Sequence, residues 1–252
     1  MRALRHVAFG SPLDALELVD VAPPTPGPGE VRCKVLASPI NPSDLLTLRG
    51  LYPIQLELPR IPGIEGVGEI ESIGVGVEGR AVGQRVLLPV RAGPWAELAV
   101  CRASDCIALP SSVEPCQLSM LRINALTARV MLSDLSPLGE GDWIIQNPGS
   151  SSVGQYTIQM ARMMGIKTVN IIRRESREGY LKAMGADVVL MDGPGLSRRV
   201  REATGGARIS MAFDGVGGSA TDRLARCLQR EGKVFCYGAV SRKAAELSVL
   251  QT

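Results

Sequence analysis

The stretch Asp142-Trp-Ile-Ile-Gln-Asn-Pro-Gly-Ser-Ser-Ser-Val-Gly-Gln155 decides how the second half of the chain is expected to fold. Its apolar start predicts a buried strand over residues 142–146, and its run of small residues predicts a tight turn. Residues 152–164 follow with the pattern of an amphipathic helix. A strand, a tight turn and a helix in this order are the first elements of a βαβ unit.

The turn matches a degenerate form of the dinucleotide-binding pattern G-x-G-x-x-G. Gly149 and Gly154 stand at its first and third positions, and Ser151 replaces the middle glycine. Small residues there let backbone N–H groups approach a pyrophosphate at the helix N-terminus. Serine hydroxyls can donate to phosphate, or they can simply cap the helix. We therefore predict a cofactor-binding turn made of Gly149, Ser150, Ser151, Ser152, Val153 and Gly154.

Downstream of the turn, buried strands continue to alternate with helices. We expect strands over 167–172, 186–191, 209–214 and 233–238, separated by helices over 177–184, 197–203 and 220–229. This alternation predicts a parallel sheet in an α/β domain.

Upstream of the turn, the first 110 residues have the texture of short strands separated by turn residues. Strands are expected over 1–9, 16–21, 31–38, 85–90 and 96–101, and the glycine-dense segment 63–76 predicts strongly bent strands. A helix is expected over 112–132. The prediction is an α/β protein with a small β-barrel domain over 1–115 and a doubly wound parallel sheet over 116–252.

Composition narrows the possible functions. The 28 Lys and Arg face 25 Asp and Glu without forming a basic stripe, so we expect no nucleic-acid partner. No apolar run reaches 18 residues, so we expect no membrane span. The six cysteines form no C-x-x-C, which argues against a disulfide scaffold or structural zinc knuckle and fits a reducing compartment.

The end of the second strand of the α/β domain indicates which dinucleotide is preferred. Arg173 and Arg174 stand where an NAD site usually carries an acidic residue, and Glu175 follows them. Guanidinium groups suit a 2′-phosphate, which predicts NADPH as the cofactor. The alternative is a pair of solvated arginines at a strand end.

Taken together, the sequence resembles the medium-chain dehydrogenase/reductase family, and within it the mitochondrial-type 2-enoyl thioester reductases. The resemblance is colinear over almost the whole chain. It rests on residues 37–44 (ASPINPSD), 50–52 (GLY), 62–67 (PGIEGV), 124–127 (NALT), 146–155, 173–174, 181–186 (LKAMGA), 215–218 (GVGG) and 237–238. It implies a GroES-like barrel and a Rossmann domain with five of six strands present.

The resemblance also implies residue roles. Tyr52 matches the proton donor of the enoyl reductases, and a phenol is protonated at neutral pH and able to donate. Asn124 matches a residue that reaches the nicotinamide, although it could also be a helix cap. The family's loop over the nicotinamide is matched by Tyr237, Gly238, Ala239 and Val240.

No metal is expected. Zinc enzymes of the resembled family carry Cys where this chain has Asn41, and Gly-His-Glu where it has Gly63-Ile64-Glu65. The single histidine, His6, is expected in an exposed strand. Packing functions are expected for the remaining candidate cysteines, Cys101, Cys106, Cys116 and Cys227.

Length and termini add expectations about assembly and location. The resembled enzymes are longer, so we expect the chain to be a fragment, a truncated isoform or a short gene product. Family homodimers pair through an edge strand that we expect to be absent here. No transit peptide is recognised at the N-terminus, and the resemblance implies a mitochondrial location, with the cytoplasm as the alternative.

The sequence thus predicts NADPH-dependent reduction of trans-2-enoyl thioesters, carried by acyl-carrier protein or CoA, in fatty-acid synthesis. One alternative is a zinc-independent quinone reductase of the same family. Another is a truncated cofactor-binding remnant without activity.

Overall fold

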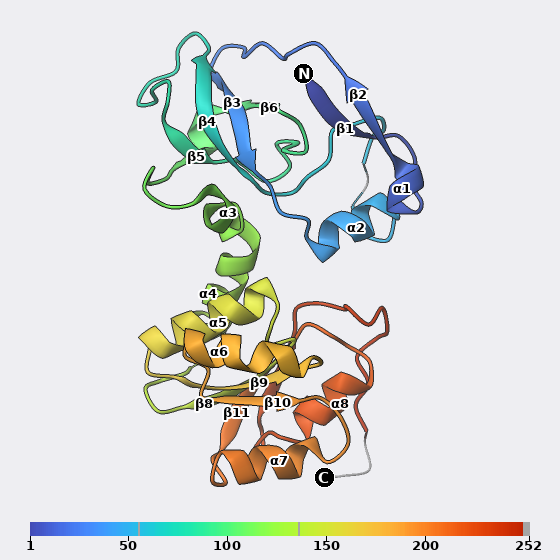
Figure 1. Cartoon of the computed structure of the whole chain (residues 1–252), viewed down its shortest axis with the longest axis vertical. Helices are drawn as coiled ribbons and strands as arrows, with labels where there is room; N and C mark the ends of the chain where they lie inside the picture. The colour runs from blue at the N-terminus through green and yellow to red at the C-terminus, as the bar shows by residue number, and fades with distance from the viewer. Residues whose placement is uncertain (55, 136, 249–252) are drawn as a thin grey trace. The chain divides into compact units, whose positions relative to one another are not determined.

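The computed structural model describes residues 1–54, 56–135 and 137–248 (Figure 1). The chain forms two compact units, residues Met1–Ile123 and Asn124–Thr252. The domain boundary expected after residue 115 remains a prediction.

The first unit is mostly β-structure with short helices. Its strands are β1 (Arg2–His6), β2 (Leu16–Asp20), β3 (Glu30–Ala37), β4 (Val67–Ile73), β5 (Arg85–Leu87), β6 (Leu98–Arg102) and β7 (Ile107–Ala108). The helices are α1 (Pro12–Ala15), α2 (Pro42–Leu48), the 3₁₀ turn η1 (Ala103–Asp105) and α3 (Pro115–Leu118). The predicted β-rich domain is confirmed, although the sequence did not predict α1 and α2.

Five strands of this unit form one antiparallel sheet in the order β6-β3-β4-β5-β7, and β1 pairs with β2. Gly68 of β4 lets this strand lie close to β3. A Cβ on Gly68 would be 2.9 Å from the Cβ of Cys33 and 3.0 Å from the carbonyl oxygen of Lys34. The presence of Gly66, Gly68 and Gly74 in segment 63–76 therefore has the predicted cause, which is close approach of one backbone to another.

His6 corrects an expectation from the sequence. It was expected in an exposed strand, but its side chain is fully buried. Its N–H donates to the carbonyl oxygen of Arg60 at 2.8 Å, and its ring contacts that of Phe9 edge-on with centroids 5.3 Å apart. Segments distant in sequence bury it, so the local pattern of β1 could not show it.

The second unit alternates strands and helices as predicted. The strands are β8 (Trp143–Asn147), β9 (Lys167–Ile172), β10 (Val188–Met191), β11 (Ile209–Asp214) and β12 (Lys233–Cys236). The helices are α4 (Leu126–Ser133), α5 (Ser152–Met163), the 3₁₀ turn η3 (Glu175–Arg177), α6 (Glu178–Met184), α7 (Leu196–Ala203) and α8 (Ser219–Ala225). All five predicted strands are confirmed.

These strands form one parallel sheet in the order β10-β9-β8-β11-β12. The chain moves outward from β8 to β10 and then returns to β11 beside β8, so the order reverses next to β8. Apolar cores cover both faces: Ile144 and Phe213 belong to one cluster, Ile145 and Ala212 to another. A ligand site is expected where the strand order reverses, beyond the carboxyl ends of the strands.

The continuous helix expected over 112–132 is wrong. The segment is divided into α3, a π-helical turn at Leu121–Ala125 (η2) and α4. Apolar periodicity gave the helical character of the segment but not these interruptions, because a π turn keeps a similar side-chain composition.

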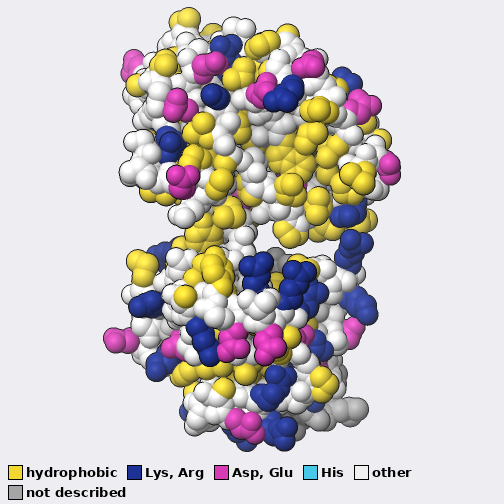
Figure 2. Space-filling view, in the orientation of Figure 1, with side chains coloured by type: hydrophobic (Ala, Val, Ile, Leu, Met, Phe, Trp, Pro, Cys, Tyr) yellow, Lys and Arg dark blue, Asp and Glu magenta, His cyan; other side chains and the backbone are white. Residues whose placement is uncertain are grey.

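The first unit exposes several large apolar side chains that line a depression. Large apolar side chains are exposed on the first unit, with Leu13 at 91%, Leu18 at 71% and Ile40 at 69% exposed, and apolar atoms gather on the face of this unit seen in Figure 2. Together with neighbouring residues they line a shallow depression of about 590 Å³. Within the described residues, no helix combines the length and the apolar character that a bilayer span requires.

Candidate functional site

The turn between β8 and α5 has the form of an anion-binding helix start. Ser151 is the N-cap of α5, and its Oγ accepts a hydrogen bond from the N–H of Gly154 at 3.0 Å. The Ser151 N–H donates to the carbonyl oxygen of Pro148 at 3.0 Å, which closes the turn. The hydroxyl of Ser151 thus caps the helix, which was one of the two uses predicted for it.

Both glycines of the turn are required by close packing. A Cβ on Gly149 would lie 2.9 Å from the Cβ of Asn170 on β9. A Cβ on Gly154 would lie 2.5 Å from the carbonyl oxygen of Gly149 and 2.7 Å from that of Pro148. A larger residue at either position would force the turn away from the strands, so the glycines keep a compact turn close to the end of the sheet.

The other members of the turn contribute differently. Val153 is buried in the core of the unit, so only its backbone is available to a ligand. The carbonyl oxygen of Ser150 accepts from Nε2 of Gln155 at 3.0 Å, while Ser150 and Ser152 are partly exposed. The hydroxyls of Ser150 and Ser152 are therefore the better placed to donate to a bound anion.

A cluster of buried polar side chains on β8 and β9 is hydrogen-bonded to the turn between β8 and α5. Nε2 of Gln146 donates to the carbonyl oxygen of Gly154 at 2.9 Å and to Oδ1 of Asn170 at 2.6 Å. Nδ2 of Asn170 donates in turn to Oγ1 of Thr168 at 2.9 Å and to the carbonyl oxygen of Val188 at 3.1 Å. Sequence reasoning missed this role, although polar residues inside otherwise apolar strands are a usable signal.

Arg173, Arg174 and Glu175 lie exposed directly after β9. Within the described residues, neither arginine makes an ion pair or a side-chain hydrogen bond. The β9 end is therefore a basic position whose guanidinium groups are not engaged by the protein. Unengaged guanidinium groups can bind a 2′-phosphate, and they equally fit the alternative of a solvated pair at a strand end.

The loop after β12 packs against the loop after β11. A Cβ on Gly238 would lie 2.9 Å from the carbonyl oxygen of Gly215, and the N–H of Val240 donates to that oxygen at 3.1 Å. The hydroxyl of Tyr237 donates to the carbonyl oxygen of Asn147 at 3.3 Å. Ala239 and Val240 are exposed.

Tyr237 itself is held inside the protein. Burial, together with the charge of Asp214, raises the pKa of its phenol to about 12, although a hydrogen bond with Ser151 acts in the opposite direction. Tyr237 therefore stays protonated and links β12 to the turn residues Asn147 and Ser151.

Asp214 is a further structural anchor that the sequence did not reveal. It is fully buried, and its Oδ1 accepts from the N–H groups of Val216 and Gly217 at 2.9 and 3.1 Å. Its Oδ2 accepts from the hydroxyl of Thr221. The carboxylate thereby fixes the loop against which Gly238 packs.

In the first unit, Tyr52 follows helix α2 and is partly buried. The intervening Gly50 adopts a φ of +71°, and a Cβ there would lie 3.2 Å from the ring of Phe9. The carbonyl oxygen of Tyr52 accepts from the N–H of Ile54 at 2.7 Å. Within the described residues, its hydroxyl makes no hydrogen bond, so it is available to a ligand.

The segment leading to Tyr52 is anchored by buried polar groups. Asn41 is the N-cap of α2; its N–H donates to Oδ2 of Asp44 and its Nδ2 donates to Oε1 of Glu65, both at 2.8 Å. Oε2 of Glu65 accepts from the N–H of Ile123 at 2.9 Å. Burial, with the charge of Glu65 adding to it, raises the pKa of Asp44 to about 6 despite hydrogen bonds from the backbone of Asn41 and Ile64.

Asn124 is buried in the π-helical turn, and the N-cap of α4 is its neighbour Ala125. It is therefore not a simple exposed helix cap. Its expected contact with a nicotinamide stays a prediction.

Asn41 and Ile64 occupy the positions at which zinc enzymes of the resembled family carry Cys and His. Asn41 and Glu65 bind each other, and the side chain of Ile64 has no atom that can ligate a metal. The described residues contain no group of three His, Cys, Asp or Glu arranged to hold a metal.

Cys116 is exposed, so its expected packing function is wrong, whereas Cys101 and Cys106 are buried and Cys227 is partly buried.

Comparison with known proteins agrees with both units. Residues 27–111 match the alcohol dehydrogenase GroES-like domain, and residues 152–252 match the zinc-binding dehydrogenase domain. The chain is 34% identical over 254 residues to the mitochondrial enoyl-[acyl-carrier-protein] reductase of Arabidopsis thaliana, covering 98% of this chain and 68% of that protein. The chain belongs to the medium-chain dehydrogenase/reductase family.

Two solved members of the medium-chain dehydrogenase/reductase family illustrate the range of its activities. The complex of Etr1p with NADP and crotonyl-CoA has a TM-score of 0.88 at 27% identity, over 98% of this chain and 78% of that chain. A mycobacterial quinone oxidoreductase has a TM-score of 0.81 at 30% identity, over 98% and 77%. Etr1p is named a 2-enoyl thioester reductase in a further structure. The fold alone therefore does not separate enoyl thioester reduction from quinone reduction.

Proposed function

We propose that this medium-chain dehydrogenase/reductase catalyses NADPH-dependent reduction of trans-2-enoyl thioesters, carried by CoA or acyl-carrier protein, in fatty-acid synthesis. The observation that carries the proposal is the similarity to the Arabidopsis thaliana enoyl reductase over nearly the whole chain, through both units. The residues at the turn and at Tyr52 are chemically suited to the two halves of this reaction.

The second unit is assigned the cofactor. The pyrophosphate would bind at residues 149–154, where the α5 N-terminus and the hydroxyls of Ser150 and Ser152 face an anion. Arg173 and Arg174 would bind the 2′-phosphate, with Glu175 beside them. Asn124 and the loop Tyr237, Gly238, Ala239 and Val240 would contact the nicotinamide. NADPH bound there would supply a hydride to the β-carbon of the substrate.

The first unit is assigned the proton. Hydride addition at the β-carbon leaves negative charge on the thioester oxygen and the α-carbon, so a proton must follow. The Tyr52 hydroxyl, which binds no other described residue, would donate or relay it. The buried Asn41, Asp44 and Glu65 would hold the start of α2 and so position the segment that carries Tyr52.

Location and assembly follow the same proposal. The Arabidopsis thaliana relative is named a mitochondrial enzyme, and we extend that location to this chain, with the cytoplasm as the alternative. Size-exclusion chromatography with light scattering would measure the oligomeric state.

The test compares two oxidants. With purified protein, NADPH oxidation is followed by absorbance in the presence of crotonyl-CoA and, separately, of benzoquinone. We expect rapid oxidation with the thioester and formation of butyryl-CoA. Oxidation with benzoquinone alone would reject the enoyl reductase assignment.

Quinone reduction is the second candidate, because a quinone oxidoreductase shares the fold at 30% identity. A third outcome is that NADPH raises the melting temperature while neither oxidant is reduced. That result would identify a cofactor-binding protein without activity and would reject both reductase assignments.

A further inference from the structure

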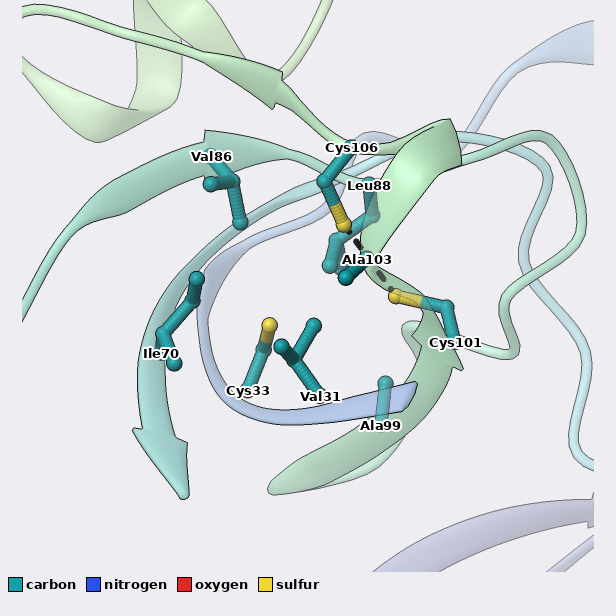
Figure 3. Packing of buried hydrophobic residues seen from close by; sticks show 9 residues of the cluster. All are labelled: Val31, Cys33, Ile70, Val86, Leu88, Ala99, Cys101, Ala103 and Cys106. Carbon is teal, nitrogen blue, oxygen red and sulfur yellow. Dashed lines mark hydrogen bonds between the residues drawn. The ribbon is translucent and has the colours of Figure 1, made fainter. Parts of the chain in front are cut away.

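Three thiols meet in the core of the first unit, apart from every residue assigned above. Cys33 lies on β3, Cys101 near the end of β6, and Cys106 between η1 and β7. All three are buried, and Figure 3 shows their side chains directed into the same core, among Val31, Ile70, Val86, Leu88, Ala99 and Ala103. Because thiols can be oxidised and can exchange disulfides, a cluster of three has chemical consequences beyond packing.

Two of these thiols are in direct contact. The Sγ atoms of Cys101 and Cys106 are 3.4 Å apart, and the pair is drawn with a dashed line in Figure 3. The two residues lie on either side of η1, so only a short segment has to adjust to bring the sulfur atoms to bonding distance.

Cys33 has less freedom than Cys106. Its strand, β3, is hydrogen-bonded to β4 on one side and to β6 on the other, with Cys33 paired to Ile70 and Ala99. Cys106 lies outside any strand, and the following β7 has only two residues paired with β5. The segment around Cys106 can therefore move toward Cys101 while Cys33 stays in place.

The surroundings also favour Cys106 as the reactive thiol. Hydrogen bonds with the Cys101 and Cys33 thiols, and then the charge of Arg80, lower the pKa of Cys106, while burial and Asp105 oppose this. The guanidinium of Arg80 donates to the carbonyl oxygen of Cys106, which holds its charge next to this residue. The thiolate is the form of cysteine that attacks an oxidant.

We propose that Cys101 and Cys106 are a modification site, at which hydrogen peroxide oxidises the two thiols to an internal disulfide bond. The Cys106 thiolate attacks the peroxide, its O–O bond breaks, and Cys106 becomes a sulfenic acid with release of one water. The Cys101 sulfur then attacks the sulfenic sulfur and a second water leaves. Two thiols and one hydrogen peroxide give one disulfide and two waters, so sulfur is oxidised and the peroxide oxygens are reduced.

A small neutral oxidant can reach the pair. Cys101 is 8% exposed and Cys106 is 3% exposed, whereas Cys33 is fully buried. Local opening of the short β7 requires the loss of few hydrogen bonds and would expose Cys106 first.

Peptide mapping of the native protein tests the proposal. The folded chain is treated with a small excess of hydrogen peroxide, free thiols are blocked with N-ethylmaleimide, and the protein is digested with trypsin. Cleavage after Arg102 separates the two cysteines into peptides 92–102 and 103–122. We expect these peptides to be linked through Cys106, the chain to lose two of its six thiols, and dithiothreitol to restore them.

Single variants and the exposed cysteines complete the test. Cys33→Ala is expected to keep the linked peptides, whereas Cys106→Ala is expected to abolish them, and Cys116→Ala removes the other cysteine of peptide 103–122 without effect. The proposal is overturned if wild-type protein shows no linkage, or if the link lies on Cys116 or Cys33. The wild-type mapping decides the matter even where a core variant does not fold.

Discussion

The two units build their candidate sites in opposite ways. In the second unit the residues proposed to bind the pyrophosphate are contiguous, residues 149–154, and polar side chains of the adjoining strands support them. In the first unit the segment leading to Tyr52 is anchored by hydrogen bonds among Asn41, Glu65 and Ile123, which are far apart in the sequence. A local sequence motif therefore predicts the site of the second unit, whereas the site of the first unit depends on residues that only the folded chain brings together.

The comparison is tested most strongly at Gly154. Replacement by valine places side-chain atoms against the carbonyl oxygens of Gly149 and Pro148. We expect the free energy of unfolding to fall by about 3 kcal/mol and NADPH binding to be lost, as measured by denaturant titration and fluorescence. Gly179→Val in α6 is the matched control, because a Cβ there meets nothing within 4 Å. Equal stability of the two variants would contradict the close packing of the turn.

The proton assignment in the first unit predicts a kinetic effect instead. Tyr52→Phe should lower turnover by about 100-fold, the usual range for loss of a positioned acid, and leave NADPH affinity unchanged. Tyr180→Phe removes a hydroxyl that donates to Oε1 of Gln155 in the second unit, and it should alter neither. Unchanged turnover in Tyr52→Phe would reject the assignment.

Asp44 should give the first unit a characteristic dependence on pH. Its folded-state pKa of about 6 lies above its ordinary value of 3.8, so the folded protein retains a proton that the unfolded chain releases. The stabilisation that Asp44 gives the folded state is fully present below the unfolded pKa of 3.8. It is lost as pH rises through the folded-state pKa of about 6, and the loss is about 2–3 kcal/mol in the free energy of unfolding. Asp44→Asn should remove this loss from denaturation curves measured between these values; an unchanged pH profile would show that Asp44 does not titrate there.

Glu65 tests the long-range anchoring directly. Glu65→Leu leaves the Asn41 amide and the Ile123 N–H without their carboxylate, and we expect a loss of about 2 kcal/mol in the free energy of unfolding. Glu71→Leu is the control, since Glu71 pairs with Arg32 at the surface and its loss should cost less than about 1 kcal/mol. The anchoring role is wrong if the two variants are equally stable.

The smallest effect is expected at the exposed end of β9. Arg173→Ala should weaken NADPH binding by about tenfold, in line with the loss of one hydrogen bond to a charged group, and leave NADH binding unchanged. Arg201→Ala changes another exposed arginine of the same unit and should affect neither cofactor. Isothermal titration with both cofactors measures this, and equal losses for NADPH and NADH would contradict recognition of the 2′-phosphate.

The sequence predicted the second unit well because the signals for its strands and its turn are local. Strand periodicity and the glycine turn are local, so β8, α5 and β9 were located to within a residue or two. In the first unit, α2 was missed because turns and helix N-caps favour the same residue types, and Asn41 belongs to one of these types. The burial of His6 was also missed, since it depends on contacts with Arg60 that no local pattern records.

The polar side chains Gln146, Asn170 and Thr168 form one chain of hydrogen bonds across two strands and the start of α5. Changing any one of them to an apolar residue leaves its neighbour buried with an unmatched donor or acceptor. Among relatives, these three positions should therefore diverge together rather than singly. A single exchange at one position would be harmful in this background and tolerated only where a compensating exchange is already present.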